Sequence, residues 1–336
     1  MGNTADICIL GAGNWGTTLA VMLAGNGHRV KQWEFRQDAA RRIAAERENK
    51  EFLPGIAIPP QVAITHDLSN ALDNAAICVF ALPSRALRDV CEQVKPLLQH
   101  DVLCLSVIKG LEQGTLLRMS QVIADVLGGA AAKLCVLSGP NIAWEIARGM
   151  PATTVVASEN ARDAELARSV LMNKAFRVYT SDDVIGLELG GALKNVIAIA
   201  SGITDGLELG ANTKGALLTR GLAEITRLGV KMRARPETFA GLSGMGDLVT
   251  TCFSGHSRNR SVGQQIGQGK KLGQVLSGMA MVAEGVGTTE AAWQLAQRHG
   301  VEMPITEQMY QVLFQAKDPR AAVGDLMTRN PKAEGR

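Results

Sequence analysis

The chain has 336 residues, of which 46% are hydrophobic, and its formal net charge is +3 at pH 7. This length is enough for two domains, and so small a charge, without a Lys/Arg-rich run, argues against a nucleic-acid partner. The chain passes into its first predicted strand at residue 6, and no apolar run reaches the ~20 residues of a membrane span, so we expect neither a signal peptide nor membrane insertion.

Apolar, strand-like runs alternate with helical stretches through the first half of the chain. They span residues 6–10, 29–33, 76–81, 102–106, 132–138, 153–157 and 176–180. This alternation is typical of βαβ units, in which helices cover both faces of a parallel sheet. The predicted fold class is therefore α/β, with an N-terminal Rossmann domain (residues 1–182) built on a doubly wound, mostly parallel sheet.

Helical patterning without a convincing strand follows residue 182. The helical stretches span residues 188–202, 214–228, 260–267, 287–299 and 304–314. We expect an all-α C-terminal domain at residues 183–330 that carries the substrate and catalytic groups.

Three glycines follow the first strand at the spacing GxGxxG. Gly11 allows a tight turn, Gly13 lets backbone approach a pyrophosphate, and Gly16 lets the next helix pack closely on the strand. Glu34 follows at about the twenty-residue offset that this pattern expects for a ribose contact. An ordinary strand-to-helix turn is the alternative, but the strand before and the helix after favour a dinucleotide site.

Lys194 lies in a stretch made of small and apolar residues, "LELGGALKNVIAIASGI". A helix of this kind packs closely on all sides, so its lysine either reaches solvent or is held with partners in a polar cleft. A desolvated lysine has a lowered pKa and suits proton transfer. Lys109, which follows a predicted strand and precedes Gly110, either reaches into the same cleft or is an exposed loop residue.

Residues 241–263 combine glycines and hydroxyl residues, and we expect an irregular loop there. Ser257, Arg258 and Asn259 then open a helix, where backbone N–H groups, a guanidinium and neutral donors can converge on a phosphate. A simple capped helix with a solvated arginine is the alternative. Glu284 opens a later helix, where it either contacts the cofactor or favours the helix dipole.

The six cysteines show no CxxC or Cys/His spacing, and the five histidines show no metal-ligand spacing. We therefore predict no metal site and a reducing, cytoplasmic location.

Six motifs occur in a fixed order: "GAGNWGTTLA", "SVIKGLE", "SGPNIAWEIA", "GGALKNVIAIASGI", "GMGDLVTTC" and "HSRNRSVG". With them the chain resembles NAD(P)-dependent glycerol-3-phosphate dehydrogenase of the bacterial type, from residue 7 to about residue 315. The resemblance implies reversible reduction of dihydroxyacetone phosphate to sn-glycerol 3-phosphate, which supplies glycerophospholipid synthesis. It also implies a Rossmann domain followed by a helical domain.

The resemblance assigns Lys194 as the general acid/base, with Asp247 orienting it. Substrate contacts are expected at Lys109, Gly139, Asn141, Lys194, Asp247, Ser257, Arg258 and Asn259. Cofactor contacts are expected at Asn14, Trp15, Lys109, Ala143, Arg258, Val282 and Glu284.

The cofactor is predicted to be NADPH or NADH. Glu34 favours NAD by bonding a ribose 2′-OH, whereas Arg36 favours NADP by pairing with a 2′-phosphate, and the balance leans slightly to NADP(H). Two other functions stay open: a related dehydrogenase acting on a β-hydroxyacid or ketopantoate, and a nicotinamide-sensing regulatory protein. A homodimer is also left open.

Overall fold

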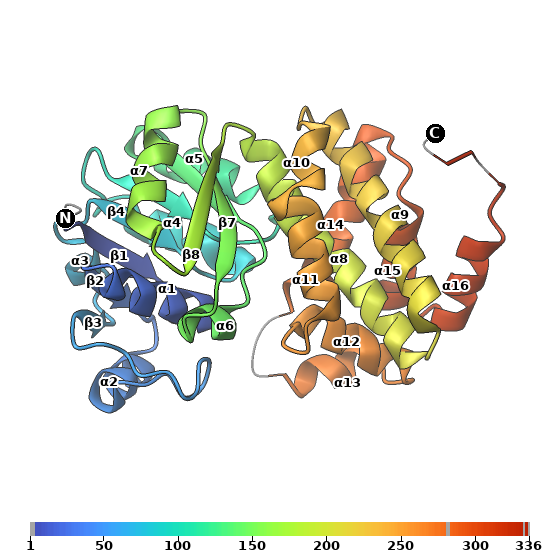
Figure 1. Cartoon of the computed structure of the whole chain (residues 1–336), viewed down its shortest axis with the longest axis horizontal. Helices are drawn as coiled ribbons and strands as arrows, with labels where there is room; N and C mark the ends of the chain where they lie inside the picture. The colour runs from blue at the N-terminus through green and yellow to red at the C-terminus, as the bar shows by residue number, and fades with distance from the viewer. Residues whose placement is uncertain (1–3, 280–282, 332, 335–336) are drawn as a thin grey trace.

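The computed structural model describes residues 4–279, 283–331 and 333–334. An eight-stranded sheet lies at one end of the molecule and a bundle of helices at the other (Figure 1). The strand order is β3-β2-β1-β4-β5-β6-β7-β8, and only the β6–β7 pair is antiparallel. The strands are β1 (Asp6–Leu10), β2 (Arg29–Trp33), β3 (Val62–Thr65), β4 (Ile77–Phe80), β5 (Leu103–Ser106), β6 (Lys133–Ser138), β7 (Ala152–Ala157) and β8 (Phe176–Ser181).

Helices cover both faces of this sheet, as the doubly wound prediction requires. The helices of this half are α1 (Asn14–Gly25), α2 (Gln37–Glu46), α3 (Leu68–Leu72), α4 (Leu87–Val94), α5 (Met119–Leu127), α6 (Ala143–Ala147) and α7 (Ala161–Leu171). In β1, Ile7 and Ile9 pack with α1 and α7, whereas Cys8 and Leu10 pack with α4 and α5. Because successive side chains point to opposite faces, an unbroken apolar strand is buried on both. The predicted fold class is confirmed.

The sequence prediction missed β3, an edge strand of four residues. Only Val62 is fully buried in it, so the run lacks the continuous apolar character of the central strands. Among the described strands it pairs with β2 alone.

The rest of the described chain after β8 is helical. It contains α8 (Val184–Gly206), α9 (Gly210–Lys231), α10 (Pro236–Ala240), α11 (Asp247–Phe253), α12 (Arg258–Gly267), α13 (Leu272–Ser277), α14 (Glu284–His299), α15 (Pro304–Phe314) and α16 (Pro319–Met327). The predicted division after residue 182 falls between β8 and α8.

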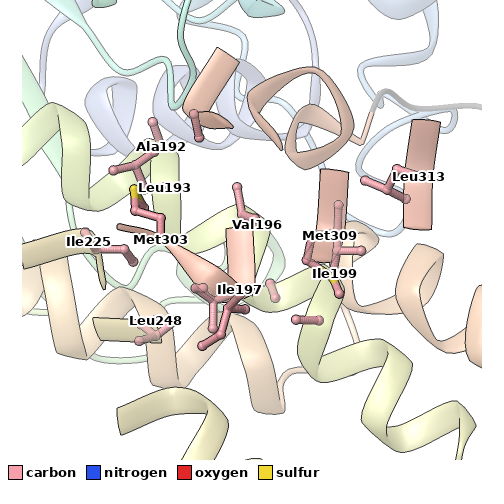
Figure 2. Packing of buried hydrophobic residues seen from close by; sticks show 14 of the residues in the cluster. Ala192, Leu193, Val196, Ile197, Ile199, Ile225, Leu248, Met303, Met309 and Leu313 are labelled. Carbon is pink, nitrogen blue, oxygen red and sulfur yellow. The ribbon is translucent and has the colours of Figure 1, made fainter. Parts of the chain in front are cut away.

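Helix α8 is the centre of the helical half. Figure 2 shows its side chains Leu193, Val196 and Ile197 packed among residues of neighbouring segments, such as Ile225 of α9 and Met303, which directly precedes α15. By length and hydropathy α8 is apolar enough to cross a membrane, which corrects the expectation that no stretch qualifies. However, 89% of its apolar window is buried inside the protein, so α8 is a core helix.

Glycines bring α12 unusually close to α8. A Cβ on Gly202 would lie 1.9 Å from the carbonyl oxygen of Arg260, and a Cβ on Gly263 would lie 1.9 Å from that of Ile199. Neither position can carry a side chain without separating the two helices. This contact fixes the first turn of α12 against the helix that carries Lys194.

Residues 241–263 are more regular than we expected. A π-helical turn, η3 (Leu242–Gly246), leads directly into α11, so the prediction of an irregular loop is wrong for this part. Leu248, Thr251 and Cys252 are buried against α8 and its neighbours. The packing of this face therefore overrides the local preferences of the glycines and paired threonines.

Candidate active site between the sheet and the helical bundle

The glycine-rich turn after β1 forms a cradle for a dinucleotide. Gly11 has φ +111°, and a Cβ on it would lie 2.5 Å from the carbonyl oxygen of Ala81, while a Cβ on Gly16 would lie 2.2 Å from that of Gly11. A Cβ on Gly13 would instead enter open space at the start of α1. Helix α1 has no acidic residue in its first turn and no side-chain cap from Gly13. These features fit a pyrophosphate at the helix N-terminus.

Two buried side-chain amides that the sequence pattern did not indicate support this turn through hydrogen bonds to its backbone. Asn49 donates to the carbonyl oxygen of Ala12 at 2.7 Å and to Thr17 Oγ1 at 2.9 Å. Gln32 donates to the carbonyl oxygen of Gly11 at 3.1 Å. Asn49 follows α2, far along the chain from the glycines, so no local pattern links the two.

Lys194 is buried in the site, with 6% of its surface exposed, which excludes the alternative of a solvent-reaching lysine. Its Nζ donates to Thr251 Oγ1 at 2.5 Å and lies 3.1 Å from Asp247 Oδ1. Thr251 Oγ1 in turn donates to Asp247 Oδ1 at 3.2 Å. Lys194 is thus held by a carboxylate and a hydroxyl on one face of α11.

Asp247 joins two lysines from different halves of the chain. Its Oδ2 accepts from Lys109 Nζ at 2.6 Å, and Lys109 also donates to the carbonyl oxygen of Gly139 at 2.8 Å. Asp247 is 2% exposed, and the Lys109 side chain is 19% exposed. Lys109 therefore reaches into the cleft, as one of its two predicted alternatives required.

Burial lowers the pKa of Lys194 to about 8, and the nearby positive charge of Lys109 acts in the same direction. Asp247 opposes the shift through its charge and its hydrogen bond. The ammonium of Lys194 can therefore give up a proton near neutral pH, whereas an exposed lysine holds it far more tightly.

The orientation of Asp247 depends on close packing between the backbone of α8 and the turn that precedes α11. The η3 turn, closed by a hydrogen bond from Gly246 N to the Gly241 carbonyl oxygen, sets the start of α11 and hence the direction of Asp247. A Cβ on Gly190 would lie 2.7 Å from the carbonyl oxygen of Ser243, so a glycine is required there for α8 to pack on this turn. Such π-helical turns often occur at functional sites.

The carboxyl ends of β5 and β6 bring polar atoms to the same cleft. Ser106 ends β5 and Ser138 ends β6, and their buried hydroxyl oxygens have no hydrogen-bond partner among the described residues. The Oδ1 atom of Asn141 is likewise buried without such a partner, while its Nδ2 donates to Thr154. Buried polar atoms of this kind suit a site that receives a polar ligand.

The predicted phosphate site forms the first turn of α12. Ser257 is the N-cap and accepts from the Arg260 backbone N–H at 3.2 Å. Burial lowers the pKa of the Arg258 guanidinium, and Glu284 opposes this shift, so Arg258 is not a fully solvated side chain. Asn259 accepts from Gly285 N at 3.0 Å and donates to Asn195 at 2.9 Å, which ties α12 to the turn of α8 that holds Lys194.

The other predicted cofactor contacts lie at the first turns of α1, α6 and α14. Glu284 accepts from the backbone N–H of Ser84 at 3.2 Å and from its hydroxyl at 2.5 Å. The carbonyl oxygens of Asn14 and Ala143 both accept from Thr18 Oγ1, which links α1 to α6. Trp15 is partly buried in the first turn of α1. Val282 lies outside the described residues.

Thr251, which accepts from Lys194 and donates to Asp247, is a residue of the candidate site that the sequence pattern did not indicate. It follows Asp247 by four residues, so both lie on one face of a helix. In the irregular loop predicted for residues 241–263, a spacing of four residues would not place two side chains together, but in α11 it does.

A second buried carboxylate, Glu188 on α8, holds the two halves of the chain together. It accepts from the Ser120 backbone N–H at 2.7 Å and from the Ser120 hydroxyl at 2.6 Å, and it forms an ion pair with Arg118. Arg118 is the N-cap of α5 and has no acceptor atom in its side chain, so Glu188 supplies the cap from another element.

Two family models match the chain in tandem. The model described as NAD-dependent glycerol-3-phosphate dehydrogenase N-terminus matches residues 6–164, and the one described as its C-terminus matches residues 183–324. The chain belongs to this family.

Curated relatives match along almost the whole length. A glycerol-3-phosphate dehydrogenase [NAD(P)+] from Geobacillus kaustophilus (strain HTA426) is 50% identical over 330 residues, which cover 98% of this chain and 96% of the relative. One from Geobacter sulfurreducens is 51% identical over 329 residues, which cover 98% of each chain. The resemblance carried by the six motifs is thereby confirmed.

A solved structure supports the same architecture. The glycerol-3-phosphate dehydrogenase of Coxiella burnetii matches with a TM-score of 0.93 and 38% identity, covering 97% of this chain and 99% of that one. The family is one of NAD(P)-dependent oxidoreductases, so a cofactor of the NADH or NADPH type is supported for the cradle described above.

Proposed function

We propose that this chain reversibly reduces dihydroxyacetone phosphate to sn-glycerol 3-phosphate with NADH or NADPH, and so supplies glycerophospholipid synthesis. The observation that carries the proposal is the Lys194–Asp247–Lys109 cluster beside the first turn of α12, in which Lys194 and Asp247 are buried and Lys109 is partly buried. It combines a proton donor, a second cation and a phosphate-suited helix start within one cleft.

In the proposed reduction, Lys194 gives its proton to the carbonyl oxygen of the substrate. Its lowered pKa matches this task at neutral pH. Asp247 keeps the ammonium oriented, and Thr251 fixes the direction of one of its N–H bonds. Lys109 stabilises the negative charge that develops on the same oxygen.

The substrate phosphate binds at the start of α12. Arg258 supplies a guanidinium, and the first backbone N–H groups of the helix supply neutral donors. Binding energy from this remote group positions the carbonyl carbon, because the Asn259–Asn195 hydrogen bond fixes α12 relative to Lys194.

The dinucleotide, when bound, supplies the hydride. Residues of this chain that would hold it are Gly11, Gly13 and Gly16 at the pyrophosphate, and Glu34 and Arg36 at the adenosine ribose. We also propose a cytoplasmic location, since all six cysteines are free thiols in buried positions.

A steady-state assay tests the proposal. The purified protein should oxidise NADH or NADPH in the presence of dihydroxyacetone phosphate, and it should be inactive with ketopantoate and with simple β-keto acids. Turnover of a keto acid instead would favour the related-dehydrogenase alternative. Dinucleotide binding without turnover of any of these substrates would favour a sensing protein.

A further inference from the structure

Five charged side chains gather where β2 ends, at the place where a Rossmann sheet receives the adenosine ribose. Glu34 and Arg36 follow β2, Asp38 and Arg42 lie on α2, and Glu51 follows α2 along the chain. They are linked to one another by ion pairs.

The guanidinium of Arg36 is held on all three of its nitrogens. Nε donates to Glu34 Oε1 at 3.0 Å, and the two Nη atoms donate to Glu51 Oε1 and Oε2 at 3.2 and 3.1 Å. The Glu51 contact is therefore the two-pronged arrangement by which arginine also binds phosphate. In this structure the fork that could take a 2′-phosphate is already bound to a carboxylate.

The two carboxylates play different parts. Glu34 is buried and also accepts from the backbone N–H of Arg36 at 3.1 Å, so it orients Arg36 from the protein interior. Glu51 belongs to a separate segment, and its side chain is 34% exposed, so an incoming anion can replace it. A second cation, Arg42, lies 3.5 Å from Glu51.

We propose that Glu51 competes with the 2′-phosphate of NADPH for the Arg36 guanidinium, and so sets the balance between NADPH and NADH. The inference rests on the proposed dinucleotide-dependent function. With formal charges, the three carboxylates exceed the two guanidinium groups by one, so the cluster is net negative before a phosphate of about −2 enters. Arg36 alone would favour NADPH, and Glu51 opposes it.

The test is Glu51→Gln, which keeps the size of the side chain and removes its charge. Dissociation constants for NADPH and NADH are measured from nicotinamide fluorescence at low and high salt. Adenosine 2′,5′-bisphosphate and AMP serve as competitors that contain no nicotinamide. We expect the variant to bind NADPH and the bisphosphate about tenfold more tightly, with NADH and AMP unchanged within about twofold. The gain should shrink as salt rises.

Two further variants make the test specific. Glu46→Gln is the matched control, because Glu46 ends α2 in the same region and its ion pair, at 3.1 Å, is with Lys50, whereas the ion pairs of Arg36 are with Glu34 and Glu51. Glu51→Gln combined with Arg36→Ala should show no gain for NADPH over Arg36→Ala alone, since the proposed competition acts through Arg36.

An unchanged ratio of NADPH to NADH affinity in Glu51→Gln overturns the inference, as does an equal gain in the Arg36→Ala background. Because these are binding measurements, they are independent of turnover. A protein that shows the predicted affinity shift but does not turn over dihydroxyacetone phosphate would refute the proposed function and leave the role of Glu51 standing.

Discussion

Replacing Lys194 by Met tests the proton-transfer chemistry directly. Methionine fills a similar volume but cannot donate a proton. General acid catalysis contributes roughly 10²–10⁴-fold, and we expect turnover to fall by about this factor. Lys194→Arg should not restore activity, because a guanidinium does not give up its proton near neutral pH.

The structure also sets the expected pH dependence. With a pKa of about 8 against an ordinary value of 10.5, release of the proton from Lys194 is easier by about 3 kcal/mol. Reduction requires the protonated lysine, so its rate should fall as pH rises above about 8. Oxidation of glycerol 3-phosphate requires the neutral amine, so its rate should rise with pH up to the same point.

The assay is turnover of dihydroxyacetone phosphate in one direction and of glycerol 3-phosphate in the other, from pH 6 to 10. NADH affinity, measured by fluorescence, should survive in Lys194→Met because the dinucleotide cradle belongs to the sheet. Lys231→Met, at an exposed lysine in the last turn of α9, is the control. Turnover of Lys194→Met within a few-fold of the parent, or parallel pH profiles in the two directions, would refute the reasoning.

Three other predictions concern charged groups elsewhere. Arg258→Ala should raise KM for dihydroxyacetone phosphate about 10- to 150-fold, which is the equivalent of a charge-assisted contact of ~1.5–3 kcal/mol. Turnover of unphosphorylated dihydroxyacetone should be affected much less. Equal losses of activity on the two substrates would mean that Arg258 has a structural role. Glu188→Ala should lower the free energy of unfolding in urea by about 3–5 kcal/mol, because it leaves Arg118 and the N–H and hydroxyl donors of Ser120 without their carboxylate. The control is Glu165→Ala at an exposed ion pair, which should lower this free energy by less than about 1 kcal/mol. Burial raises the pKa of Glu224 to about 7, so the folded state binds this proton more tightly than the unfolded state does, and the free energy of unfolding should fall as pH rises from about 4.5 to 7. Urea unfolding of Glu224→Gln should show a flatter dependence of this free energy on pH. A pH dependence equal to the parent's would contradict the assignment.

Patterns that act over a few residues were readable from the sequence. The central strands, the glycine-rich turn and the change to helices after residue 182 all follow from hydrophobic periodicity and backbone freedom. The small-residue character of α8 was enough to single out Lys194, because a lysine in a closely packed helix needs a reason to be there. The family resemblance then identified the remaining candidates.

Where local and tertiary preferences differ, the sequence misled. The edge strand β3 is short and has too few apolar residues to be predicted as a strand. Helix α11 forms because its buried face packs on α8, and not because Thr250 and Thr251 favour a helix. The hydropathy of α8 alone does not distinguish a core helix from a membrane span.

The sequence by itself determined the fold class, the dinucleotide turn and the identity of the unusual lysine. Only the tertiary structure decided which groups meet: Asp247 between Lys109 and Lys194, Thr251 on the same ammonium, and Arg36 bound to both Glu34 and Glu51. The physical reason is the separation along the chain over which each kind of interaction acts. Strand and helix formation depend on neighbours a few residues apart, whereas desolvation, ion pairing and the pKa shifts they cause depend on distances of a few ångströms between segments that lie far apart in the chain.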